Sequence, residues 1–325
     1  MQIKIGVVLI DGINDSNLRL VKQIGVDEIC TCLPREGYTN PVWEFLPLLN
    51  LKNRLLDAGL DWTVVETLPI SDKVKLGLPG RDEEIENLRR SIRNLGAAGV
   101  HNAVYTWTAL FGWMRTSFTT PVRGGAKAPS YDHAFMKNAP LTEAGVIPEA
   151  RLWDSLEYFL KAVIPVAEEA NVRLAMHPDD PPLSPIRGIG RIMISPESFQ
   201  RMIDLVPSPS NGLTFCQGCF FEMGVDVPAM IKRFVAQDRV FFAHFRNLRG
   251  TAERFTETFH DEGDVDMYGI MKAFYESGYK GAMRPDHVPT MEGETATHPG
   301  YTILGRLFAV GYMRGLMEAI EKQGR

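Results

Sequence analysis

Short runs of apolar residues alternate along the chain with longer stretches in which apolar positions recur at helical spacing. The short runs predict eight strands, at residues 3–9, 28–33, 61–66, 100–106, 173–177, 212–216, 240–245 and 281–285. The longer stretches predict eight helices, near residues 15–24, 43–58, 82–97, 151–169, 196–206, 226–236, 265–277 and 302–322. Two helix starts carry capping signals, because Ser195 precedes Pro196 and Glu197, and Asp264 precedes an amphipathic run.

Strands that alternate with helices are typical of a parallel sheet with crossover helices. Eight such units without a linker predict an α/β fold, a closed (β/α)8 barrel of the TIM type with long βα loops. An open, doubly wound sheet is the alternative. The length of 325 residues suits one barrel, so we expect a single catalytic domain over residues 1–325.

Two long stretches interrupt the alternation: residues 108–150, which contain several glycines and prolines, and residues 246–264, which are polar and charged. We expect both to be irregular loops. Both follow predicted strands, so in a barrel they would lie at the carboxyl rim, where barrel enzymes carry their active sites. The first, an inserted long loop, is also a candidate for contacts in a homodimer or higher homo-oligomer.

Composition restricts the partners and the location of the chain. A formal net charge of −5 disfavours nucleic acid, whose binding needs concentrated Lys and Arg. No run of 18 apolar residues is present, so a membrane span is not expected. The N-terminal apolar stretch lacks a small-residue cleavage site and predicts a strand, not a signal peptide. Cys30 and Cys32 fit buried thiols in a reducing compartment, which predicts a cytoplasmic protein.

Four potential metal ligands stand at the ends of four successive predicted strands: His177, Cys216, His244 and Asp286. The carboxyl ends of barrel strands converge, so residues distant in sequence meet there. Imidazole, thiolate and carboxylate are all metal ligands. Each residue alone has a structural explanation, as a hydrogen-bonded His, a buried Cys or an Asp that caps a loop. Their occurrence together favours a metal site.

Cys216 and Cys219 also form a CxxC pair. A structural zinc site would need a second pair, and a redox dithiol would need a thioredoxin-like context, so both readings are disfavoured. Cys219 is then a packing residue. No constellation of functional groups surrounds the remaining histidines, which we interpret as structural: His101, His133, His260 and His298.

Polar residues near the strand ends are suited to anion binding and acid–base chemistry. Arg284 would point to the same face as Asp286 and could clamp a substrate carboxylate. His287 follows Asp286 directly and could face a ligand. Tyr301 comes after a glycine turn, where position alone favours helix packing.

Arg246 and Asn247 follow directly after His244 and are further candidates for substrate binding. The chain contains no GxGxxG motif, no P-loop and no GxSxG elbow. Nucleotide-binding and serine-hydrolase functions therefore lack support.

Several motifs, taken in order, resemble the mannonate dehydratase family: MHPDDPP, LTFCQG, HFRN, GDVDMYGIMKAFY, RPDH and GETATHPGYTILGR. Upstream matches are DWTVVETLPISDKVKLGLPGRDEEIENLRRSIRNLGAAGV and WMRTSF. The resemblance covers most of the chain from about residue 43 onward. HPDDPP and RPDH make it specific when they occur together.

The resemblance implies a barrel of the xylose-isomerase group with a divalent metal, usually Mn2+. The family reaction removes water from D-mannonate and gives 2-keto-3-deoxy-D-gluconate. The family's metal ligands fall on His177, Cys216, His244 and Asp286, and its catalytic pair on His287 and Tyr301. A thiolate–imidazole site would by stability order prefer Zn2+ to Mn2+, so Fe2+, Co2+ and Zn2+ are alternatives.

This reaction needs the parts that the sequence supplies. A hydrogen next to a carboxylate is weakly acidic, and a metal stabilises the negative charge that develops when it is removed. One group must remove the C2 proton and another must protonate the departing C3 hydroxyl. His287 and Tyr301 fit these two roles in either order.

The chain departs from the family pattern along the substrate wall. IGVVLIDGIND stands where the family has an Arg-Trp-Tyr-Gly tip, GCFFEMG replaces a Gly-Ser-Leu-Gly type of loop, and Val288 replaces a glycine. The predicted ligands and the acid–base pair are retained. A metal-dependent sugar or sugar-acid isomerase or epimerase is the alternative enzyme, and a binding protein that has lost activity is the non-enzymatic alternative.

Overall fold

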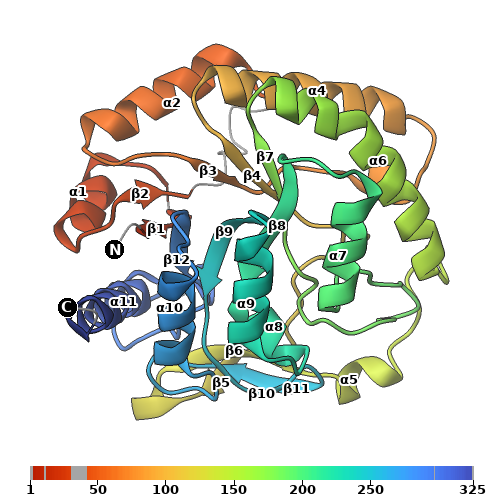
Figure 1. The fold of residues 1–325 in the computed structure, drawn as a ribbon. Helices are drawn as coiled ribbons and strands as arrows, with labels where there is room; N and C mark the ends of the chain where they lie inside the picture. The colour runs from red at the N-terminus through yellow and green to blue at the C-terminus, as the bar shows by residue number, and fades with distance from the viewer. Residues whose placement is uncertain (1–2, 11, 31–41, 296, 324–325) are drawn as a thin grey trace.

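The computed structural model describes residues 3–10, 12–30, 42–295 and 297–323. Its main sheet consists of eight parallel strands in the order β2 (Glu28–Ile29), β1 (Lys4–Val7), β12 (Ala282–Pro285), β9 (Val240–Phe245), β8 (Asn211–Cys216), β7 (Arg173–Met176), β4 (Asn102–Tyr105) and β3 (Val64–Glu66). A parallel bridge between Glu28 and Asp61, just ahead of β3, links the two outer strands. The sheet therefore closes on itself, with helices around it (Figure 1).

The predicted TIM barrel is confirmed, and the open doubly wound sheet is wrong. Each predicted strand coincides with an observed one, with ends that differ by a few residues. The apolar runs reflect burial on both faces, as in β8 and β9, where every residue is buried. The end of the second predicted strand and Cys32 lie outside the described residues.

The eight predicted helices are present: α1 (Asp15–Gln23), α2 (Phe45–Asp57), α4 (Arg81–Ala97), α6 (Glu149–Glu169), α7 (Pro196–Leu205), α9 (Val227–Ala236), α10 (Met267–Glu276) and α11 (Ile303–Gln323). Ser195 caps α7 as expected and accepts a hydrogen bond from the Ser198 N–H. The cap expected at Asp264 is wrong, because α10 begins later and is capped by Asp266. Asp264 instead accepts from the Gly250 N–H.

The sequence predicts irregular loops for the two long stretches, and this prediction is wrong. Each stretch contributes two strands to a second sheet. β5 (Ser117–Pro121) and β6 (Lys127–Asp132) come from the first stretch, and β10 (Leu248–Thr251) and β11 (Arg254–Glu257) from the second. They pair antiparallel in the order β10, β11, β6, β5. This rim sheet lies at the bottom of Figure 1. Because its strands follow β4 and β9, it stands at the carboxyl end of the barrel.

Short elements complete the fold: α3 (Asp72–Lys75), the 3-10 turn η1 (Arg123–Gly125), α5 (Ala134–Lys137) and α8 (Gln217–Glu222). Among the residues that the structure describes, no helix is both long enough and apolar enough to cross a membrane.

Candidate active site

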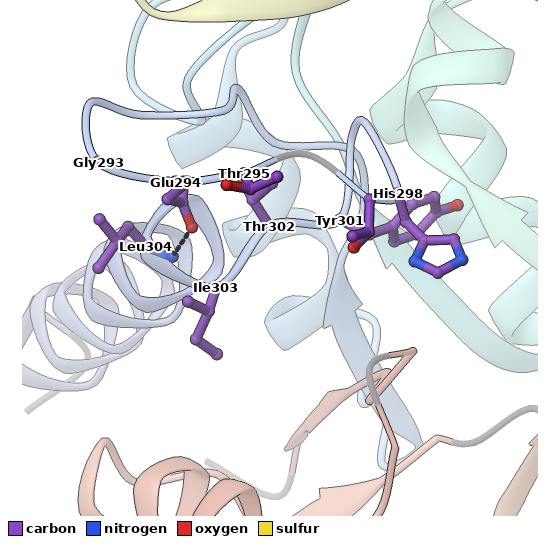
Figure 2. A pocket seen from close by; sticks show the side chains of 9 residues that line it. Gly293, Glu294, Thr295, His298, Tyr301, Thr302, Ile303 and Leu304 are labelled. Carbon is purple, nitrogen blue, oxygen red and sulfur yellow. Dashed lines mark hydrogen bonds between the residues drawn. The ribbon is translucent and has the colours of Figure 1, made fainter.

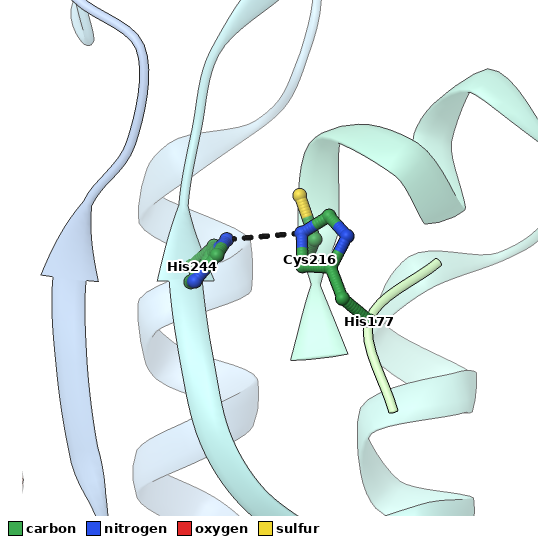
Figure 3. Close-up of side chains that lie close together, drawn as sticks. All are labelled: His177, Cys216 and His244. Carbon is green, nitrogen blue, oxygen red and sulfur yellow. Dashed lines mark hydrogen bonds between the residues drawn. The ribbon is translucent and has the colours of Figure 1, made fainter. Parts of the chain in front are cut away.

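Three predicted metal ligands lie together at the carboxyl rim (Figure 3). His177 directly follows β7, Cys216 ends β8 and His244 lies in β9, and these three strands are neighbours in the sheet. One donor atom from each residue lies within 4.8 Å of the other two. The facing ring nitrogens, His177 Nε2 and His244 Nδ1, are 3.1 Å apart.

Asp286, the fourth predicted ligand, reaches the same cluster from the end of β12. Its Oδ2 lies 3.5 Å from His244 Nδ1 and 3.8 Å from Cys216 Sγ. Its backbone N–H donates to the carbonyl of Phe245, which fixes the start of the loop. The structure thus brings the four residues together, while metal binding by them stays a prediction.

Burial and neighbouring charges set the protonation of the cluster. Burial would raise the pKa of Cys216, but hydrogen bonds from Cys219 and both imidazoles hold that pKa well below its usual value. Burial would likewise raise the pKa of Asp286, and His287, Arg284 and His244 lower it well below the usual range. A thiolate and a carboxylate, the forms that a cation requires, are therefore favoured.

His244 carries an additional proton in the absence of a cation. Burial and Arg284 would lower its pKa, but Glu66 and Asp286 raise the pKa of His244 to about 10. A metal that binds this ring must displace that proton, so metal binding would release protons.

His287 and Tyr301, the predicted acid–base pair, lie beside the cluster. Tyr301 Oη is 3.1 Å from His287 Nε2, and the two rings meet edge to face at 5.3 Å between centroids. His287 Nε2 is also 3.6 Å from Asp286 Oδ1. Burial raises the pKa of Tyr301 well above its usual value, so its phenol stays protonated. Tyr301 precedes α11 and faces His287, an arrangement that helix packing alone does not require.

A cavity of about 110 Å³ opens onto these groups. Three members of the cluster line it, His177, His244 and Asp286, while Cys216 does not. The acid–base pair and Thr67, Thr106, Thr108 and Trp113 also line it. An outer pocket of about 320 Å³, lined by the loop that leads into α11, shares Tyr301 with it (Figure 2). In that loop Glu294 accepts the Leu304 N–H and so caps the start of α11.

Arg284 lines the cavity, but protein carboxylates engage its guanidinium. Its Nε and Nη2 donate to the two oxygens of Glu66 at 2.8 and 2.6 Å, and Nη1 donates to Asp286 Oδ1 at 2.8 Å. Burial would raise the pKa of Glu66, but Arg284 and His244 lower it to about 2. The structure shows Arg284 orienting a predicted ligand, Asp286; its role in substrate binding stays a prediction.

Arg246 and Asn247, the other substrate-binding candidates, are buried behind the cavity. Arg246 lies 2.9 Å from Glu222, 3.2 Å from Asp180 and 2.8 Å from Glu257. The carboxamide of Asn247 bonds backbone groups within the second polar stretch. Neither is among the described residues that line the cavity, and their substrate-binding role also stays a prediction.

Two buried charged residues that the sequence did not single out, Arg115 and Glu257, stand behind His287. Arg115 makes two parallel hydrogen bonds of 2.8 Å to Asp180 and another of 2.5 Å to Glu257. Glu257 Oε1 lies 3.0 Å from His287 Nδ1. Glu66 could have been found by the reasoning that gave the ligands, because it too ends a predicted strand.

Two residues interpreted as structural have well-defined surroundings. Cys219 is buried 3.4 Å from Cys216 Sγ and accepts a hydrogen bond from Arg246. His260 is buried, bonds the carbonyl of Phe245 at 2.7 Å, and has its pKa lowered to about 4 by burial.

A family model for D-mannonate dehydratase matches residues 11–144 and 141–325 of the chain. The mannonate dehydratase of Thermotoga maritima is 39% identical over 319 residues, which cover 86% of this chain and 87% of that protein. The mannonate dehydratase of Streptococcus pneumoniae is 37% identical over 312 residues, with 87% and 85% covered.

Solved structures agree with the sequence comparison. The crystal structure of mannonate dehydratase from Streptococcus suis serotype 2 superposes with a TM-score of 0.92 at 33% identity, over 99% of this chain and 95% of that chain. A D-tagatose 3-epimerase-like protein gives a TM-score of 0.66 at 14% identity, over 99% and 100% of the two chains, which shows a shared fold alone. The chain therefore belongs to the D-mannonate dehydratase family and is an enzyme of the hydro-lyase class.

Proposed function

We propose that the enzyme removes water from D-mannonate to give 2-keto-3-deoxy-D-gluconate, with a divalent metal held by His177, Cys216, His244 and Asp286. The observation that carries the proposal is the convergence of these four side chains beside a cavity that also holds the His287–Tyr301 pair. The substrate is proposed from the family, whose named members align with most of the chain.

The donor atoms fit a transition-metal ion. Ligand atoms about 2.0–2.3 Å from a metal stand roughly 3–4 Å apart. The measured separations in the cluster are 3.1, 3.5 and 3.8 Å. Two ring nitrogens that face each other at 3.1 Å need a proton or a cation between them. Mn2+ is proposed from the family, and Fe2+, Co2+ and Zn2+ also suit imidazole and thiolate ligands.

A metal bound at this cluster supplies Lewis-acid stabilisation for the charge that develops at the substrate carboxylate. His287 Nε2 faces the cavity and accepts the proton from C2 of the substrate. Tyr301, whose pKa burial raises, keeps its phenol proton and donates it to the C3 hydroxyl, which leaves as water. The resulting enol rearranges to the 2-keto acid, so that one water is lost and no oxidant is needed.

The rest of the wall suits a sugar acid. Thr67, Thr106 and Thr108 bring hydroxyl groups that can bond substrate hydroxyls, while the ring of Trp113 offers an apolar face to C–H groups.

The test is incubation of the Mn2+-loaded protein with D-mannonate, followed by trapping of 2-keto acids with semicarbazide. We expect product that depends on the metal and disappears with EDTA and in His287→Asn. Turnover of another aldonate in place of mannonate would change the substrate but keep the elimination. An epimeric aldonate without any 2-keto acid would overturn the proposal in favour of the isomerase or epimerase alternative.

A further inference from the structure

We infer that Glu257, the last residue of strand β11 in the rim sheet, is a positioning residue that holds His287 with its proton on Nδ1 and an unprotonated Nε2 toward Tyr301 and the cavity. The inference rests on the proposed function only for the role of His287 in the reaction. The contact itself is observed: Glu257 Oε1 lies 3.0 Å from His287 Nδ1.

The two nitrogens of His287 face different partners. Nδ1 faces a carboxylate oxygen, and Nε2 lies 3.1 Å from the phenol oxygen of Tyr301. An ionised carboxylate only accepts hydrogen bonds, so Nδ1 must be the donor. The neutral imidazole then presents an unprotonated Nε2 to the cavity, the form that a proton acceptor needs.

Two arginines keep Glu257 ionised and in place. Arg246 donates from Nε to Oε2 at 2.9 Å and from Nη2 to Oε1 at 2.8 Å, and Arg115 Nη2 donates to Oε1 at 2.5 Å. Burial would raise the pKa of Glu257, but the guanidinium groups of Arg246 and Arg115 lower it well below its usual value. Arg115 Nε also donates to Oε1 at 3.2 Å, so that with His287 five donors surround the two oxygens and leave this carboxylate little freedom to rotate.

A competing arrangement, in which Arg115 donates to His287 Nδ1, is excluded by hydrogen-bond counting. Arg115 Nη2 lies 3.4 Å from Nδ1, farther than the carboxylate of Glu257. The two hydrogens on Nη2 are already directed to Asp180 Oδ2 at 2.8 Å and to Glu257 Oε1. No hydrogen remains on that nitrogen for the imidazole.

The backbone is shaped to permit this arrangement. A Cβ at Gly218 would stand 2.7 Å from Cδ of Arg246, so only glycine leaves room for the Arg246 side chain there. Strand β11 is held by pairing with β6, in which Phe255 lies opposite Tyr131 with the two rings stacked at 5.8 Å. The rim sheet therefore supports the acid–base pair and does not merely cover the barrel.

The direct test is the imidazole 15N–1H correlation spectrum of the metal-free protein at alkaline pH, with His287 assigned by its loss in His287→Asn. We expect a protonated Nδ1 and an unprotonated Nε2 at His287 in the wild-type protein. A proton on Nε2 would overturn the inference. This measurement needs no turnover, so its failure is distinguishable from a failure of the proposed reaction.

The kinetic test compares Glu257→Ala with Glu222→Ala. Glu222 is buried and bonds the same Arg246 at 2.9 Å, but no hydrogen bond or ion pair among the described residues joins it to His287. For Glu257→Ala we expect kcat to fall by roughly 100-fold or more, with KM changed by less than about threefold. For Glu222→Ala we expect both constants within about threefold. Equal losses in kcat for the two variants would mean a purely structural role and would overturn the inference.

Discussion

Glu66 and Arg284 are 218 positions apart in the sequence, yet two hydrogen bonds of 2.8 and 2.6 Å join them at the mouth of the barrel. Each of them also meets a predicted metal ligand. Arg284 donates to Asp286 at 2.8 Å, and Glu66 Oε1 lies 3.0 Å from His244 Nε2. One buried ion pair thus orients two of the four side chains proposed to hold the metal, and partners of this kind tune ligand geometry.

Loss of Arg284 should destabilise the protein. Arg284→Met leaves the Glu66 and Asp286 carboxylates buried with the His244 imidazolium as the cation between them, so we expect the free energy of unfolding to fall by roughly 3 kcal/mol. Urea unfolding in the presence of EDTA measures the change, because a bound cation would compensate for the lost charge.

The control for this variant is Arg254→Met. Arg254 pairs with Asp132 at 3.5 Å, but its side chain is 83% exposed, so we expect a loss below about 1 kcal/mol. Similar losses from the two substitutions would contradict the buried-pair explanation.

Glu28 should make a contribution to stability that falls as the pH rises. Burial raises the pKa of Glu28 from 4.5 to about 7, although a hydrogen bond from Thr63 opposes the shift. Between these pH values the unfolded chain has lost a proton that the folded protein still holds. The contribution of Glu28 to the free energy of unfolding therefore decreases from about pH 4.5 to about pH 7 and then levels off, by on the order of 3 kcal/mol.

Glu28→Gln keeps an acceptor for the hydroxyl of Thr63 and removes the titration. Above about pH 7 we expect the variant to be more stable than the wild-type protein by on the order of 3 kcal/mol. Below about pH 4.5, where Glu28 is protonated in both states, we expect little difference. Urea unfolding at the two ends of this range measures both, with the exposed Glu253→Gln as control. A pH profile that Glu28→Gln leaves unchanged would refute the assignment.

The two neighbouring cysteines should differ in metal binding. Cys216 Sγ lies within 4.8 Å of a ring nitrogen of His177 and of His244. Cys219 instead accepts a hydrogen bond from Arg246. A thiolate bound to Co2+ gives sulfur-to-metal charge-transfer absorption in the near ultraviolet. We expect this band in the wild-type protein and in Cys219→Ser, and its loss in Cys216→Ser. A band that survives Cys216→Ser would count against the proposed site.

Trp113 should report occupancy of the cavity. It lines the cavity, its ring lies 4.9 Å from that of His287, and 39% of it is exposed. The other tryptophans are at most 7% exposed: Trp43, Trp62, Trp107 and Trp153. Acrylamide should therefore quench Trp113 first, and D-mannonate should reduce the quenching. The ligand-sensitive part should vanish in Trp113→Phe; its persistence there would place the signal elsewhere.

The sequence predicts the barrel well because parallel strands that are buried on both faces are continuous apolar runs. Residues 240–245 are apolar except for His244, and all of them are buried. A polar residue that ends such a run is conspicuous, which is why His177, Cys216 and Asp286 could be selected before any geometry was known. The closed barrel then brings the ends together.

The strands of the rim sheet have no comparable apolar pattern in the sequence. Strand β5 has no buried residue, and β6 alternates only weakly between buried and exposed positions. The buried charged residues were not predicted from the sequence, for a related reason. Arg115 and Glu257 lie in polar stretches, and charged residues in such stretches are normally exposed. Strand β11, which carries Glu257, pairs with β10 and with the distant β6, and pairing between distant segments has no local signature.

The pairing of β6 with β11 also limits when the rim sheet can form during translation. Tyr131 leaves the ribosome long before Phe255, its partner in the rim sheet, has been made. The contact between Glu257 and His287 can form only after both residues have been synthesised, well after Tyr131. A nascent chain that stops just before residue 287 therefore contains the strands of the rim sheet without the histidine that Glu257 positions.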